Sequence, residues 1–196
     1  LARLTKAIRP TLQDPRAVVP WMIPVNMRGA VNCTRDTDNH TSYLGIRVHP
    51  DESLLELHRK ILKALSRNEH WGNWYAFKLA NCMTQAMRTA LVAKGMCMSQ
   101  WSLGAFSNLG EWDPDKKITN PQAAGCWLFA PPALRMQKLA VGCATFQGRL
   151  SLTIQAHADL TSDSGVVRNW MSRWVAEIES CLAVLAANPG VLPLAD

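Results

Sequence analysis

The sequence of 196 residues lacks several features that would assign a protein to a class at once. No apolar run reaches the roughly 20 residues that a membrane-spanning helix needs. The first ten residues carry three charges and a proline where a signal peptide has an unbroken apolar stretch. The six cysteines form no C-x-x-C pair, and no histidine stands near them at ligand spacing. We therefore expect no membrane span, no signal peptide, no metal site and no dense disulfide framework, and a reducing cytoplasm is the simplest compartment.

Catalytic signatures are also scarce. The sequence has no Walker loop, no G-x-G-x-x-G, no G-x-S-x-G elbow and no H-x-x-x-H pair. His40, in a polar stretch, is either a ligand contact or a plain surface histidine, and the second is the more common case. His157 and Asp159 either make an acid–base pair or owe their spacing to strand alternation. Motifs alone therefore indicate no catalytic set.

The composition is that of a folded domain with a basic balance. Hydrophobic residues make up 48% and charged residues 18%, so we expect one domain over 1–196 with a real core. The net charge of +6 permits an anionic partner. The densest basic cluster includes Arg59, Lys60 and Lys63, where the solvated face of a helix is a simpler interpretation than a phosphate contact. No basic face carries interleaved aromatics, so we expect no nucleic-acid partner.

Two segments carry strong helical patterns. Asp51 is the expected N-cap of the first helix. Its apolar stripe comprises Leu54, Leu55, His58, Ile61, Leu62 and Leu65. The second, a long closing helix, begins after Ser162 or Asp163. Its stripe comprises Val167, Trp170, Met171, Trp174, Ile178, Cys181, Leu182 and Leu185. A third helix is predicted over 74–94, with Gly95 as its end.

Strand patterns alternate with these helices. Residues 41–48 alternate as a strand does, and 136–146 with 149–157 flank Gly148 as a hairpin. Weaker strand signals cover 96–109 and 123–130.

Two further segments complete the order of elements. The apolar run 17–25 contains Pro20 and Pro24, which predicts an edge strand or two short pieces. Leu1–Ile8 has helical spacing and looks like the end of a helix that begins upstream. The order predicts an α/β fold with a mixed sheet layered with helices.

Five short segments carry a family resemblance. They are Pro24–Arg28, Asn39–Val48, Pro50–Leu65, Phe106–Gly110 and Phe146–Leu152. In this order and spacing they resemble the C-terminal half of the chloramphenicol-acetyltransferase-like superfamily. That superfamily includes the condensation domains of non-ribosomal peptide synthetases and the alcohol O-acetyltransferases.

The resemblance implies one lobe of a two-lobed acyltransferase with a substrate channel between the lobes. The acyl group would move from a thioester, on coenzyme A or a carrier protein, to a hydroxyl or an amine. Neither carrier would be a tightly bound cofactor. The general base of the superfamily is the second histidine of His-His-x-x-x-Asp in the N-terminal lobe. This sequence contains no His-His pair, so the chain is not expected to be catalytically competent without that lobe in cis.

The resemblance also implies substrate-binding residues but no catalytic residue. They are Asn26, Arg28, Phe106, Ser107, Asn108, Gly110 and Trp112. Ser107 and Asn108 would be polar groups of the channel wall, and Phe106 and Trp112 its apolar part. Trp112 follows a polar segment, so simple loop packing is an equal alternative. For Arg28 a structural ion pair is favoured over a catalytic role.

Two other functions remain open from the sequence. The first is a non-catalytic interaction or dimerisation module, which would form a homo-oligomer or bind a partner through the exposed channel face. The second, ranked last, is a binder of nucleic acid or of an anionic surface, and only the net charge supports it.

Overall fold

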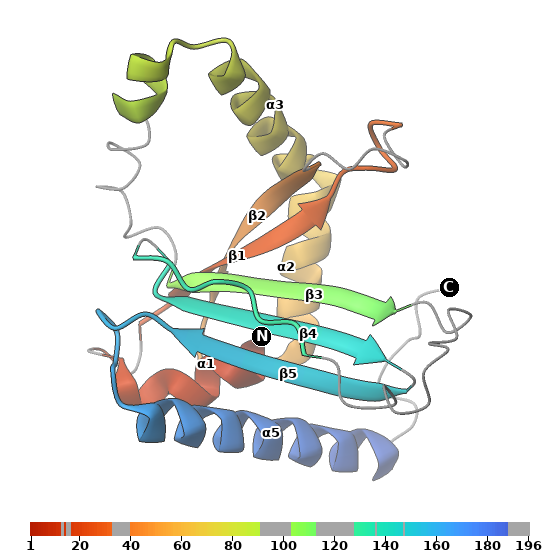
Figure 1. The fold of residues 1–196 in the computed structure, drawn as a ribbon. Helices are drawn as coiled ribbons and strands as arrows, with labels where there is room; N and C mark the ends of the chain where they lie inside the picture. The colour runs from red at the N-terminus through yellow and green to blue at the C-terminus, as the bar shows by residue number, and fades with distance from the viewer. Residues whose placement is uncertain are drawn as a thin grey trace, which may run out of the picture.

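The structure, a computed structural model, describes residues 1–12, 14, 17–32, 40–90, 103–112, 128–135, 137–146 and 148–187. A five-stranded sheet in the order β2-β1-β3-β4-β5 forms one layer (Figure 1). Its strands are β1 (Val19–Asn26), β2 (Thr41–Val48), β3 (Gly104–Trp112), β4 (Leu139–Phe146) and β5 (Arg149–Ala156). Strands β1, β3 and β4 are parallel, whereas β2 and β5 run antiparallel to their neighbours. The predicted α/β class with a mixed sheet is confirmed.

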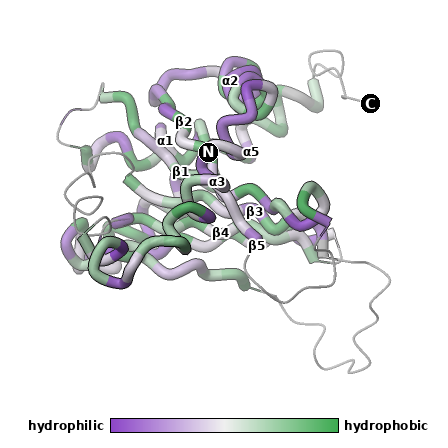
Figure 2. Tube along the Cα trace, turned by 90° about the horizontal axis from the view of Figure 1, so that it is seen from above, coloured by the Kyte–Doolittle hydropathy of each residue, from purple (hydrophilic) through white to green (hydrophobic). Residues whose placement is uncertain are grey.

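Helices form the second layer. They are α1 (Ala2–Ile8), α2 (Leu54–Ser66) and α5 (Ser164–Ala187), whereas α3 (Glu69–Asn81) lies beside β2 and extends away from the sheet (Figure 1). A single 3-10 turn at Arg9–Thr11 and a helical segment at 85–90 complete the helical structure of the described residues. Seen from above, α2 and α5 lie on one side and β3, β4 and β5 on the other (Figure 2). None of the helices in the described part of the chain combines the length and the apolar character needed to cross a bilayer.

The core lies between the sheet and the helices. Alternate residues of the strands face α1, α2 and α5, and among them Trp21, Leu139 and Val141 are completely buried. Trp21 is completely buried, and its indole Nε1–H donates to Thr5 Oγ1 of α1 at 2.9 Å. A buried indole needs such a partner, because an unpaired N–H costs about 1–3 kcal/mol.

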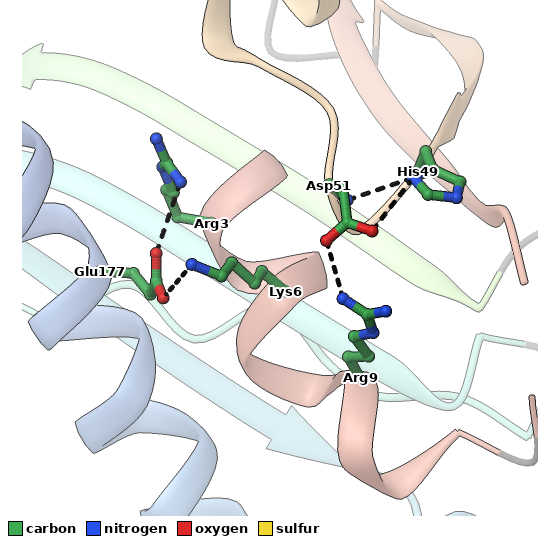
Figure 3. Close-up of polar contacts among 6 residues, drawn as sticks. All are labelled: Arg3, Lys6, Arg9, His49, Asp51 and Glu177. Carbon is green, nitrogen blue, oxygen red and sulfur yellow. Dashed lines mark hydrogen bonds and ion pairs between the residues drawn. The ribbon is translucent and has the colours of Figure 1, made fainter. Parts of the chain in front are cut away.

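Ion pairs fix α1 between two other elements (Figure 3). Glu177 of α5 accepts from Arg3 at 3.4 Å and from Lys6 at 2.6 Å. At the other end, Arg9 contacts Asp51, which follows β2, at 2.7 Å. These partly exposed pairs contribute modestly, so the buried side chains of α1 provide most of its anchoring.

Asp51 is therefore not the cap of α2, and the predicted cap was wrong. Ser53 is the N-cap: its Oγ accepts from Glu56 N at 3.2 Å, and Glu56 Oε2 accepts from Ser53 N at 2.9 Å. This reciprocal capping box satisfies two free helical donors at once. The buried face of α2 is centred on Leu57 and Ala64.

The predicted stripe of α2 is consequently only partly right. Ile61 and Leu65 pack on the core, but Leu54, Leu55 and Leu62 are 37%, 38% and 50% exposed, and His58 is exposed as well. Several apolar side chains repeat at helical spacing on two faces of α2. The sequence pattern therefore did not identify which face the sheet covers.

Other boundaries also differ from the predictions. The helix predicted over 74–94 begins at Glu69 and ends at Asn81, and residues 91–95 lie outside the described residues. Residues 128–130, predicted to end a strand, belong to no strand. The hairpin is confirmed with Gly148 at φ 71°, and Asp163 precedes α5, its Oδ1 accepting from Gly165 N at 2.7 Å. In the stripe of α5, Trp170 and Trp174 are buried, whereas Leu182 is 59% exposed.

Candidate functional site

Two neighbouring parallel strands, β1 and β3, separate almost as soon as they meet. They pair only at Trp21–Gly104 and Met22–Ala105, whereas β1 pairs with β2 along its whole length. Figure 1 shows β1 and β3 diverging toward their carboxyl ends. Within the described residues, the facing edges of both strands therefore have no ladder partner beyond this short contact.

A proline explains where the pairing stops. The Pro20 carbonyl accepts from Leu103 N at 2.7 Å, so the main-chain groups of even-numbered residues in β1 point toward β3. Pro24 belongs to the same set and has no N–H to donate. The hydrogen bond that residue 24 would donate to β3, the next one of the ladder after Met22, therefore cannot form. The prediction that the prolines place this strand at a sheet edge was wrong, because β1 lies between β2 and β3.

The separation lies at a reversal in the order of the strands. From β1 the chain continues to β2 on one side, and from β3 it continues through β4 to β5 on the other side. In open α/β sheets, ligands bind outside the carboxyl ends of the strands at such a switch point. We therefore take the carboxyl ends of β1 and β3 as the candidate site.

Two asparagine turns occupy this site. At the end of β1, Asn26 Oδ1 accepts from Arg28 N at 3.0 Å. In the middle of β3, Asn108 Oδ1 accepts from Gly110 N at 2.9 Å, within an irregularity of the β3–β4 register between Asn108 and Glu111. Gly110 has φ 70°, a backbone conformation that favours glycine. Both asparagines and Gly110 thus shape the backbone of these strands, which their sequence motifs did not reveal.

Ser107 lies on the face of the sheet that the helices leave open. It is half-buried and pairs in register with Gly142 of β4. Most neighbouring side chains on this face are small, namely Ala105, Ala140, Ala144, Ser151 and Thr153, whereas Met22 and Gln155 at its margins are longer. A flat floor of small side chains lets another chain approach the sheet closely.

Residues 128–135 make such an approach. The Phe129 carbonyl accepts a hydrogen bond from Thr153 Oγ1 over Gly142. A Cβ at Gly142 would lie 2.8 Å from Pro131 Cδ and closer still to the Phe129 carbonyl, so this crossing requires glycine. We call residues 128–135 the crossing segment. The sequence indicated it only through its prolines.

Phe106 points to the opposite side of β3 from Ser107. Its ring packs edge-on against Trp174 of α5, with ring centroids 6.3 Å apart and an interplanar angle of 69°. Phe106 therefore belongs to the helical side, and the two residues do not line one wall. Trp112 is the last residue of β3 rather than part of a loop, and Arg28 is partly buried after β1.

His40 is buried beside the end of β1. It is 7% exposed, its carbonyl accepts from Met27 N at 2.8 Å, and its ring lies 5.8 Å from that of Trp74 in α3. The interpretation of His40 as a surface histidine was therefore wrong. No local pattern indicated this burial, because Trp74 comes from a helix 34 positions further along the chain.

The basic cluster of α2 lies elsewhere. Arg59, Lys60 and Lys63 line an open depression of about 580 Å³ together with His49, Asp51, Glu52 and Glu56. Lys60 is held by Glu52 at 2.5 Å and by the Arg47 carbonyl at 3.1 Å. Acidic groups thus balance the basic ones, which favours a solvated face over a phosphate site. In the described part of the chain, no group of three or more His, Cys, Asp and Glu side chains is arranged to hold a metal ion.

Comparisons with known proteins give limited information. No protein-family model and no curated protein matches the sequence. Among solved structures, the epimerization domain from the third module of tyrocidine synthetase B is similar, with 14% identity and a TM-score of 0.46. The alignment covers 93% of this chain and 41% of that one, so the chain spans less than half the length of that domain.

Proposed function

We propose that this chain is one lobe of an acyl-transfer protein and that the carboxyl ends of β1 and β3 form the wall of its substrate channel. One observation carries the proposal. The segments Pro24–Arg28 and Phe106–Gly110, about 80 positions apart in the sequence, lie on the two neighbouring parallel strands that separate at the switch point.

The separated strand edges suit a donor that carries amide groups. On β3 the Phe106 carbonyl and the Asn108 N–H point toward β1, and on β1 the Pro24 carbonyl points toward β3. None of the three has a ladder partner in the described part of the chain. A phosphopantetheine arm, on coenzyme A or on a carrier protein, is extended and contains two amides. Its amides would pair with these groups as a short strand does.

The chemical step places few demands on this lobe. The hydroxyl or amine of the acceptor attacks the thioester carbonyl, a base removes the proton, and the thiol leaves with a proton as the tetrahedral intermediate collapses. We assign the base to an N-terminal lobe with His-His-x-x-x-Asp. The role of the present chain is to bind and orient, with Ser107 and the asparagine turns of Asn26 and Asn108 at the wall.

The binding part of this proposal is tested by NMR titration of the chain with S-acetyl-pantetheine. We expect saturable shifts of the main-chain amides of Asn26 and of residues 106–111. The variant Ser107→Leu should reduce binding because the larger side chain occupies the open face. Ser162→Leu, an exposed position before α5, is the matched control. Shifts outside these residues, or equal effects of the two variants, would contradict the proposed site.

The lobe assignment is tested separately by determining the reading frame upstream of Leu1. A preceding segment of about 200 residues with His-His-x-x-x-Asp, active on thioesters when joined to this chain, would support it. A natural chain without such a segment would leave the alternative of an interaction module. The exposed side chains of α3 favour that alternative, since Tyr75 and Leu79 are 64% and 63% exposed.

A further inference from the structure

The two outer edges of the sheet differ in how their main-chain groups are satisfied. On β2, the carbonyl groups of Tyr43 and Arg47 point outward and accept from Asn73 of α3 at 2.8 Å and from Lys60 of α2 at 3.1 Å. Helical side chains thus cap this edge. Capping of this kind is a usual way to prevent a sheet from pairing with another chain.

The edge of β5 has no such protection. His157 N donates to the Lys138 carbonyl at 2.8 Å, so odd-numbered residues of this strand point their main-chain groups toward β4. The outward set is Leu150, Leu152, Ile154 and Ala156. Within the described residues, no hydrogen bond reaches their outward N–H and C=O groups. The eight residues of β5, Arg149–Ala156, include one charge and no proline, so the strand is a long, uncapped edge.

We propose that a second copy of this chain pairs with this edge, β5 against β5, and continues the sheet across a two-fold axis. One antiparallel register uses all four outward residues. It places Leu150 opposite Ala156 of the second copy and Leu152 opposite its Ile154. The helices of both copies then lie on the same face, so α5 does not occupy the position of the added strand.

The side chains along β5 are complementary in this register. Leu150 lies on the helical side of the sheet but is 55% exposed. Beside Ala156, at the other end of the strand, an open groove of about 470 Å³ has Ile154, Val167 and Met171 among its lining residues. Pairing Leu150 with Ala156 brings the exposed leucine of each copy to the groove of the other, whose lining also includes polar residues such as Asp163 and Arg168. A two-fold axis places each end of β5 against the opposite end of the second copy. An exposed leucine at one end and a groove at the other therefore contact each other twice in the dimer.

Charges agree with the same register. Arg149 lies opposite His157 of the second copy, and in that copy Asp159, in the turn after β5, lies 3.7 Å from His157 Nδ1 and 3.5 Å from Arg135 Nε. Arg149 is exposed, and the Asp159 side chain is 44% exposed. The register therefore brings Arg149 of each copy toward the His157–Asp159 pair of the other, once at each end of the interface.

Sedimentation equilibrium of the chain tests the proposal. We expect a monomer–dimer equilibrium with a dissociation constant below about 0.1 mM. The variant Leu150→Lys should weaken the dimer about a hundredfold, because two buried leucines are lost, each equivalent to about tenfold. Leu182→Lys, at a leucine of similar exposure on α5, should leave the dimer unchanged. A monomeric chain, or equal effects of the two variants, would overturn the proposal.

A charge exchange tests the register. Arg149→Glu and Asp159→Arg should each weaken the dimer, and the double variant should restore it. If the double variant does not recover the dimer affinity, the stated register is wrong. If the chain is monomeric and a peptide of another sequence binds along β5, the occupant of this edge is not a second copy. Pantetheine binding does not enter these measurements, so the outcome is independent of the proposed acyl-transfer function.

Discussion

Replacing Gly142 with alanine should destabilise the protein far more than a single methyl group suggests. The glycine lies in β4 beneath the crossing segment. An added Cβ would lie 2.6 Å from Thr153 Oγ1, 2.8 Å from Pro131 Cδ and still closer to the Phe129 carbonyl oxygen. Contacts below 3.0 Å are essentially never seen for a real Cβ. At least two of these neighbours are backbone or ring atoms, which cannot rotate away.

The magnitude follows from what must move. Overpacking a well-packed site by one methyl group costs about 1–3 kcal/mol. Displacing the Phe129 carbonyl also breaks its hydrogen bond with Thr153, which adds about 0.5–1.5 kcal/mol. We therefore expect Gly142→Ala to lower the free energy of unfolding by about 2–4 kcal/mol, a large fraction of the 5–15 kcal/mol typical of a domain.

Urea denaturation followed by tryptophan fluorescence measures this difference. The control is Gly45→Ala in β2, where an added Cβ would meet no atom within 4 Å. That change should be neutral or stabilising by up to about 1 kcal/mol, because alanine loses less backbone entropy on folding. If both variants have the same stability, the crossing segment does not lie on Gly142 as described. Limited proteolysis within 128–135 should then also be unaffected by Gly142→Ala.

Two further predictions concern titratable groups. Hydrogen bonds from Ser53 lower the pKa of Glu56 below its ordinary value of 4.5, so the unfolded chain binds the proton more tightly and stability falls as the pH decreases below that value. Glu56→Gln should reduce this loss of the free energy of unfolding in denaturation experiments between pH 6 and pH 3. An unchanged pH dependence would contradict the capping box. Burial raises the pKa of Cys143 to about 11, so at pH 8 a thiol reagent should modify exposed Cys82 and leave Cys143 unmodified until the protein unfolds. Equal modification rates by mass spectrometry would contradict the burial of Cys143.

The parts of the fold that local patterns determine were predictable. Residues 41–48, the hairpin around Gly148 and the helix after Asp163 follow from alternation, turn chemistry and capping, which depend on neighbours in the sequence. The face of α2 that packs on the sheet was not predictable in this way. Its leucines allow two apolar faces, and only packing against β2 and the anchoring of Glu52 decide between them.

The candidate site was predictable in its residues but not in its geometry. Asn26, Ser107 and Asn108 were identified through a resemblance of motifs, and the structure places them on adjacent strands, at the end of β1 and in the middle of β3. The opposite directions of Phe106 and Ser107 follow from strand alternation once both lie in β3. The burial of His40 against Trp74 depends on contacts between distant segments, and no local pattern indicates such contacts.

The prolines of β1 show how a correct local argument can lead to a wrong position in the sheet. Proline removes one main-chain donor, so it excludes pairing only on the side to which that N–H would point. Pro20 and Pro24 are four positions apart and therefore affect the same side, which leaves the ladder with β2 intact along eight residues. On the β3 side the strand behaves as an edge beyond Met22 although it lies inside the sheet. Two prolines an even number of positions apart thus predict a strand that pairs fully with one neighbour and separates from the other. Here that separation produces the opening that we propose as the substrate channel.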